Sequence, residues 1–174
     1  MTDTTKPLVN KVAQKALITL DLEEYFPKPE DLALIDLKDY LFKGLILREA
    51  DFREAVKNTD WSQYKSKYVA LHCTTNAIIP MWAYMVLSAE LAPYAVDIAF
   101  SNTEQAAEIF LLHNVAKLDA EQFKGQRVVV KGCGDRKVPE AAFVQITQQL
   151  ANIARAVMYG EPCSTVPVFK KSVD

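Results

Sequence analysis

The sequence predicts an α/β protein, a single-domain layered sandwich with a mixed, largely parallel sheet. Two observations favour this class. Strand-like apolar stretches alternate with helical patterns along most of the chain. A strand–cysteine turn–helix pattern also occurs twice, at 71–83 and 131–143, where a cysteine is followed by a polar turn, a proline and a helical pattern. The chain of 174 residues fits one domain, 1–174, with 1–9 as a flexible lead-in.

The individual elements follow from local patterns. Runs of apolar residues in KYVALHC and QRVVVKG are typical of buried strands, and Pro80 and Pro139 suit the first positions of helices. At 10–26 the pattern predicts a helical turn or two and then a short apolar run. The remaining strands are expected at 32–37 and 95–100, with a final one in 166–171, and helices at 48–58, 80–92, 104–117 and 139–159, the last stopped by Gly160.

Composition limits the classes of function. Half of the residues are apolar, 24% are charged and the net charge is -2, which gives no electrostatic basis for binding nucleic acid or an anionic membrane. No apolar run is long enough to cross a bilayer, and the N-terminus lacks an apolar signal core. We therefore expect a cytoplasmic protein. Its three cysteines do not fit a disulfide framework, because their number is odd and that compartment is reducing.

The three cysteines are the candidate functional residues. Cys73, Cys133 and Cys163 all lie in predicted turns, whereas a core cysteine usually lies within a strand or helix. Glycines stand within three residues of Cys133 and Cys163, and Pro80 begins the helix expected after Cys73. Cys73 and Cys133 fall between a strand and a helix N-terminus, which favours the thiolate. Our hypothesis is that the three bind one metal ion or cluster, with zinc or an iron–sulfur cluster as candidates. Three protein thiolates would leave one coordination position open.

A fourth ligand would have to come from a neighbouring side chain. His72 precedes Cys73 directly, and successive strand residues point to opposite faces, which argues against it. Asp135 suits a turn or an outer-shell acceptor better than a ligand position. His113 lies in an apolar helical stretch and is expected to be a core or surface histidine.

Two other classes of function stay open. One is a thiol-dependent enzyme with Cys133 or Cys73 as nucleophile; Lys131 and Arg136 would favour a Cys133 thiolate, but no general base is evident. The other is a protein-interaction module in which the cysteines are buried structural residues. Its aromatic anchors would be Trp61, Tyr64, Trp82 and Tyr84. Association of several copies of the chain is also open.

Four segments carry a resemblance to a known family: DWSQYKSKYVAL, CTTNAIIPMWAYM, VVVKGC and MYGEPCSTVPVFKK. With them the chain resembles, from about Asn10 to Lys171, a bacterial family defined by a domain of unknown function, number 2480. The resemblance implies an association with SUF-type iron–sulfur cluster assembly, and so iron–sulfur assembly proteins as partners. By this resemblance, Cys73, Cys133 and Cys163 are the positions that match the family's cysteine segments. The family pattern often has an acidic residue where this chain has Asn76.

Overall fold

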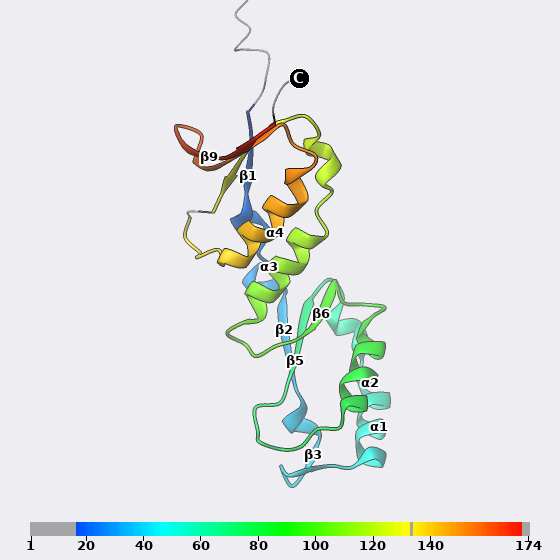
Figure 1. Ribbon diagram of the computed structural model, residues 1–174. Helices are drawn as coiled ribbons and strands as arrows, with labels where there is room; N and C mark the ends of the chain where they lie inside the picture. Colours follow the sequence, from blue (N-terminus) through cyan, green and yellow to red (C-terminus); the bar gives the residue numbers. More distant parts are fainter. Residues whose placement is uncertain (1–16, 133, 172–174) are drawn as a thin grey trace, which may run out of the picture. The chain divides into compact units, whose positions relative to one another are not determined.

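The computed structural model describes residues 17–132 and 134–171, which divide into two compact units (Figure 1). Unit 1 comprises residues 17–24 and 115–171, and unit 2 comprises Tyr25–Asn114. The expectation of one domain over 1–174 stays a prediction, and the lead-in at 1–9 lies outside the described residues. No described helix has the length and apolar character needed to cross a membrane.

Unit 2 contains a three-stranded parallel sheet in the order β2-β5-β6. Two helices pack on one face of this sheet around Phe52, whose ring makes edge contacts with Tyr40 and Trp82 at centroid distances of 5.2 and 5.5 Å. Phe110 packs with small side chains in a second apolar cluster. The elements are β2 (Leu32–Asp36), the hairpin β3 (Leu41–Phe42) and β4 (Ile46–Leu47), α1 (Glu49–Asn58), β5 (Tyr68–His72), α2 (Met81–Leu91), β6 (Asp97–Phe100) and α3 (Ala106–Ala116), whose last two residues belong to unit 1.

Unit 1 contains a four-stranded sheet in the order β1-β7-β8-β9. The first three strands are parallel, and β9 pairs antiparallel with β8. The three valines of β7 are all buried, as expected for a strand covered on both faces. The elements are β1 (Leu17–Asp21), β7 (Arg127–Lys131), α4 (Glu140–Ala151), β8 (Ala156–Glu161) and β9 (Ser164–Lys170). The α/β class with largely parallel strands is thus confirmed, and the strands form separate sheets.

The two units repeat the same local structure at a constant shift of 59 positions. Ser66 and Gly125 both have positive φ, 63° and 68°, and each donates its N–H to the turn after the next helix, at Tyr94 and Ile153 respectively. Asp60 and Asp119 each cap a 3₁₀ turn with a 3.0 Å hydrogen bond. The helices bury matching side chains, with Ala83, Leu87 and Leu91 of α2 corresponding to Ala142, Ile146 and Leu150 of α4.

This register corrects the alignment of the two cysteine turns. If the two cysteines are aligned with each other, the turns differ by one residue, because Cys73 precedes Pro80 by seven residues and Cys133 precedes Pro139 by six. In the structure both strands and both helices keep the shift of 59, so the two turns are equally long. Cys73 therefore corresponds to Gly132, and Cys133, which lies outside the described residues, corresponds to Thr74. The strand and the helix are therefore repeated in the two units, whereas the two cysteines do not stand at corresponding positions.

One predicted element is wrong, and another is defined more closely by the structure. The helix expected at 139–159 ends at Ala151, and the apolar residues that follow it form β8, in which Gly160 is a strand residue with a φ of 122°. The apolar run expected after a helical turn at 10–26 is strand β1 from residue 17, and residues 10–16 lie outside the described part. The other predicted strands and helices are confirmed to within a few residues at their ends.

Candidate functional site

Cys73 lies at the carboxyl edge of the parallel sheet of unit 2. It follows directly after β5, and β2 ends beside it, because Asp36 and His72 are register partners. In parallel α/β sheets this edge is the usual position of ligand sites, because the loops that lead into the helices gather there. Cys73 therefore lies in the loop that leads from β5 to α2.

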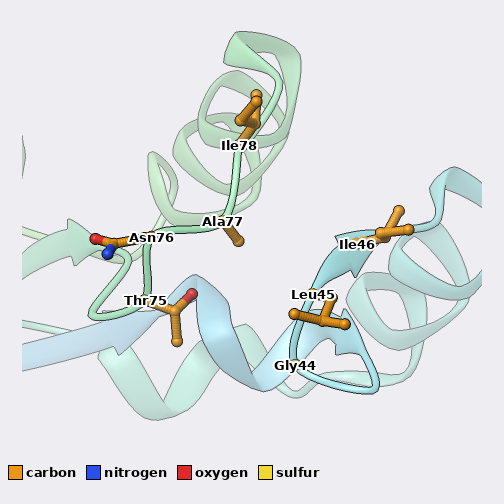
Figure 2. Close-up of a pocket in the computed structure, with 7 residues that line it drawn as sticks. All are labelled: Gly44, Leu45, Ile46, Thr75, Asn76, Ala77 and Ile78. Atoms are coloured by element: carbon orange, nitrogen blue, oxygen red, sulfur yellow. The ribbon is translucent and has the colours of Figure 1, made fainter.

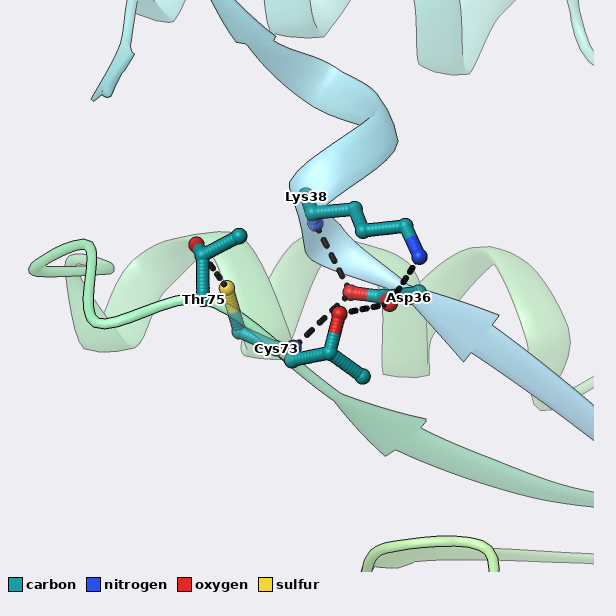
Figure 3. Close-up of polar contacts among 5 residues, drawn as sticks. Asp36, Lys38, Cys73 and Thr75 are labelled. Carbon is teal, nitrogen blue, oxygen red and sulfur yellow. Dashed lines mark hydrogen bonds and ion pairs between the residues drawn. The ribbon is translucent and has the colours of Figure 1, made fainter. Parts of the chain in front are cut away.

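The Cys73 thiol is free and half-buried. Its sulfur lies 3.3 Å from Thr75 Oγ1, a hydrogen bond in which either atom can donate (Figure 3). The side chain also packs against the apolar cluster beneath α1 and α2. A thiol that is fixed by a hydrogen bond and still partly accessible differs from a fully enclosed core cysteine.

The carboxylate of Asp36 holds the loop that follows Cys73. It is only 9% exposed, and it accepts hydrogen bonds from the Thr74 N–H at 3.1 Å and the Thr74 hydroxyl at 2.5 Å (Figure 3). On its other side it accepts the Lys38 N–H at 3.0 Å and pairs with the Lys38 ammonium at 3.2 Å. Thr74, the residue after Cys73, therefore donates two hydrogen bonds to Asp36 at the end of strand β2.

Burial and these hydrogen bonds shift the pKa values of Asp36 and Tyr84. Burial alone would raise the pKa of Asp36, but hydrogen bonds from Thr74 and Lys38 outweigh it and lower the pKa to about 2. Burial, together with the negative charges of the Cys73 thiolate and the Asp36 carboxylate, raises the pKa of Tyr84. Asp36 is therefore ionised at neutral pH, and Tyr84 is a neutral hydroxyl close to the thiol.

The lowered pKa of Asp36 predicts an acid-dependent contribution to stability. A carboxyl whose pKa is lower in the folded state stabilises the fold above its ordinary pKa of 3.8, and this stabilisation is lost as the pH falls toward about 2. We expect the loss to amount to about 2 kcal/mol, from 1.36 kcal/mol per unit of pKa shift. Urea denaturation of wild type and Asp36→Asn over this interval measures it. The difference in free energy of unfolding between the two proteins should shrink as the pH falls, and a constant difference would contradict the prediction. Asp39→Asn, at an exposed position, is the control.

A recess of about 510 Å³ adjoins the Cys73 loop. One wall is the tip of the β3–β4 hairpin, Gly44–Ile46, and the other is the loop Thr75–Ile78 (Figure 2). Thr75 lines this recess and also contacts the Cys73 sulfur. A ligand bound in the recess would consequently touch the residue that fixes the thiol.

The two histidines and Asp135 occupy separate environments. His113 Nδ1 lies 3.0 Å from Asp97 Oδ2 in a half-buried pair. The ring of His72 lies 5.9 Å from that of Phe100, and its Nδ1 is buried without a hydrogen-bond partner among the described residues. Asp135 is exposed. Within residues 17–132 and 134–171, no three histidine, cysteine, aspartate or glutamate side chains are grouped as a metal site would require.

Cys163 lies in unit 1, in the exposed turn between β8 and β9. Lys131, the last residue of β7, pairs with Asp21 at 3.2 Å and with Glu161 at 3.6 Å, so the ends of β1, β7 and β8 meet at one edge of the sheet. The turn that carries Cys163 follows Glu161 directly. Cys73 and Cys163 thus belong to different units, Cys133 lies outside the described residues, and a site shared by all three stays a prediction.

Sequence reasoning missed the polar residues that hold the Cys73 loop. A signal for Asp36 is present in a second repeat, because LITLDLEEYF at 17–26 and LALIDLKDYL at 32–41 share two leucines, an aspartate and a tyrosine in register. In the structure Asp21 and Asp36 both end a parallel strand and both accept the backbone N–H two residues later at 3.0 Å. The repeat therefore marks a fixed structural position at the sheet edge.

These features define an α/β protein with two repeated parallel-sheet units and free cysteines at the carboxyl edges of its sheets. The chain belongs to the family described as Protein of unknown function (DUF2480), which matches residues 6–171. This confirms the resemblance seen in the sequence over almost the whole chain. No curated protein and no solved structure matches it significantly.

Proposed function

We propose that this protein is an accessory factor that binds a soft metal ion or an iron–sulfur cluster through thiolates, with Cys73, Cys133 and Cys163 as ligands. The observation that carries the proposal is the position of Cys73, a free, half-buried thiol at the carboxyl edge of a parallel sheet. Cys163 supports it, because that thiol is also free and stands where β8 ends, beside the end of β7. Soft thiolate ligands suit zinc and iron–sulfur clusters.

The surroundings of Cys73 fit a ligand that is exchanged with another molecule. Its loop is held by Asp36, so the thiol is positioned by the protein itself, and Thr75, which contacts the sulfur, lines the adjoining recess. Preorganisation of this kind lowers the entropy cost of binding. An association with iron–sulfur cluster assembly proteins, in the cytoplasm, is part of the same proposal.

Substitution of single cysteines tests the proposal. We expect protein reconstituted anaerobically with ferrous iron and sulfide, or with zinc, to retain metal after desalting, and Cys73→Ser to lose most of it. Cys133→Ser and Cys163→Ser should each lower the metal content if the three share one centre. Elemental analysis gives the stoichiometry, and visible absorption distinguishes a cluster from zinc. Ser62→Ala, which leaves every cysteine in place, is the matched control.

Retention of metal by all three serine variants would contradict the proposal, and so would a folded wild type that stays metal-free under every condition. A second candidate, thiol catalysis at Cys73, is favoured by one observation, the recess that reaches Thr75. It predicts a metal-free protein in which Cys73 is alkylated much faster than Cys133 or Cys163 near neutral pH. The same set of variants therefore separates the two functions.

A further inference from the structure

A second recess lies in unit 1, at the end of the sheet where β7 and β8 begin. Its volume of about 370 Å³ falls within the range of small-molecule sites, roughly 300 to 1,000 Å³. Three of its lining residues are cations, Arg127, Arg155 and Lys170. The other four are apolar, Ala156, Met158, Pro167 and Phe169. We call it the β8 recess, and no acidic side chain of the described residues lines it.

The pairing of the strands brings two of the cations to one face of the sheet. Arg127 lies opposite Ala156 in the parallel pair of β7 and β8, and Ala156 lies opposite Lys170 in the antiparallel pair of β8 and β9. Side chains of opposite residues point to the same face, so Arg127 and Lys170 flank the small methyl group of Ala156. Two strand spacings, about 10 Å, separate their backbones. Arg155 directly precedes Ala156, and its carbonyl accepts the Lys171 N–H at 2.9 Å. The three cations are thus neighbours of one small residue.

The three cations have no counter-charge in the described part of the chain. None of their side chains forms an ion pair or a hydrogen bond with another described residue. Elsewhere in unit 1, Lys124 pairs with Glu121 at 3.1 Å and Lys131 pairs with Asp21 at 3.2 Å. Like charges around one recess repel one another, and an anion bound between them removes this repulsion. The β8 recess therefore favours an anionic ligand.

The repeat within the chain shows that the fold does not require a cation at position 127. At the shift of 59 positions, Arg127 corresponds to Tyr68 and Met158 to Ala99. In unit 2 helix α3 covers these positions, because the Tyr68 ring lies 5.2 Å from that of Phe110 and Ala99 packs in the same apolar cluster. In unit 1 the chain continues from β8 into strand β9 in place of a helix. The β8 recess thus occupies the face that a helix covers in unit 2.

The charge and the lining together define the class of ligand. A phosphate monoester carries about -1.5 to -2 charges at pH 7. The planar guanidinium of arginine can bind two phosphate oxygens at once. The apolar side chains of the lining offer contacts that inorganic phosphate cannot use. The net charge of -2 gives no attraction to a long polyanion such as nucleic acid. A small organic phosphate fits both the cations and the apolar lining.

We propose that the β8 recess binds a small organic phosphate, with the phosphate group between the three cations and the organic part against the apolar lining. The inference goes beyond the metal binding proposed above and is independent of it. The recess lies where β7 and β8 begin, whereas Cys163 follows the end of β8 and Cys73 belongs to unit 2. Substitutions in the recess should therefore leave the metal content of the reconstituted protein unchanged.

Isothermal titration calorimetry of the full chain at low ionic strength tests the proposal, with phenyl phosphate as the probe. Phenyl phosphate should bind at one site per chain, and inorganic phosphate should bind at least about tenfold more weakly, because it lacks the apolar ring. Phenol, which lacks the phosphate, should not bind detectably. The double substitution Arg127→Ala with Arg155→Ala should raise the dissociation constant for phenyl phosphate by at least about tenfold, because it removes two charged hydrogen-bond donors. Lys124→Ala, which removes a cation of the same unit outside the recess, should leave that constant unchanged.

Circular dichroism checks that each variant is folded, and Arg127→Gln, at an exposed position, serves as a second variant if the double variant is not. The proposal is overturned if phenyl phosphate does not bind, or if the double variant binds it as tightly as the wild type does. It is equally overturned if Lys124→Ala weakens binding as much, because general attraction by positive charge would then account for the binding. Equal affinity for inorganic phosphate would also overturn it, because the apolar lining would then contribute nothing.

Discussion

Replacing Asp36 by alanine is expected to lower the free energy of unfolding by about 3 kcal/mol, the range seen when one partner of a buried charged network is removed. The substitution leaves the Thr74 hydroxyl, the Thr74 and Lys38 N–H groups and the Lys38 ammonium without their common acceptor. It also releases the loop after Cys73, so we expect the Cys73 thiol to be alkylated several times faster. Urea denaturation measures the first effect, and mass spectrometry of peptides after timed alkylation measures the second.

Thr74 provides the matched variants for this experiment. Thr74→Ser keeps the hydroxyl and should behave like wild type, whereas Thr74→Val loses the 2.5 Å hydrogen bond and should show part of both effects. Asp39→Ala, at an exposed neighbouring position, should change neither quantity. If Asp36→Ala lowers stability but leaves the alkylation rate of Cys73 unchanged, then Asp36 supports the fold without positioning the thiol.

Elements with strong local signals could be predicted from the sequence. The consecutive apolar residues of β5 and β7 required burial on both faces, and parallel strands in an α/β protein provide it. Prolines at 80 and 139 marked the starts of α2 and α4 correctly to within one residue. The family was also recognisable from segments spread along the chain, as the match over residues 6–171 confirms.

The end of α4 could not be predicted because its stop signal is absent. In unit 2 the helix ends just before Pro93, whereas Asn152 stands at the corresponding position of unit 1. The apolar residues Ala156–Met158 continue a pattern that a helix or a strand could carry, so periodicity did not separate them. Pairing with a distant strand makes this segment a strand, because β8 pairs in parallel with β7 and Val157 lies opposite Val128.

The candidate site was predicted in part. The sequence predicts turn positions for Cys73 and Cys163, and both residues lie in loops between elements. That Cys163 follows a strand at a sheet edge was not predicted, because residues 139–159 were expected to form one helix. The hydrogen bonds that hold the Cys73 loop join Asp36 to Thr74, which lies 38 positions further along the chain, and no local pattern predicts such a contact. What the sequence does contain is the repeated aspartate at the end of β1 and β2. It became interpretable only once the register of both sheets was known.

Gly160→Ala is expected to be the most damaging single glycine substitution in the described part of unit 1. Gly160 has a φ of 122°, which side chains rarely tolerate, and an added Cβ would lie 2.5 Å from the backbone oxygen of Ser164. Backbone cannot move aside as a flexible side chain can, so we expect a loss of about 3 kcal/mol or more in the free energy of unfolding. Because Gly160 pairs with Thr165 across the hairpin, Cys163 in its turn should become more reactive.

Gly125→Ala is the matched control, since it also has positive φ, 68°, but no atom within 4 Å of an added Cβ. Unit 2 carries Ser66 at the corresponding position with a φ of 63°, so a side chain is tolerated there. We expect a loss of about 1 kcal/mol for Gly125→Ala, from the left-handed backbone alone. Equal losses in the two variants, measured by urea denaturation, would show that the backbone conformation and not the contact with Ser164 makes glycine necessary at position 160. A larger loss for Gly160→Ala would assign the difference to that contact, and so to the geometry of the hairpin that presents Cys163.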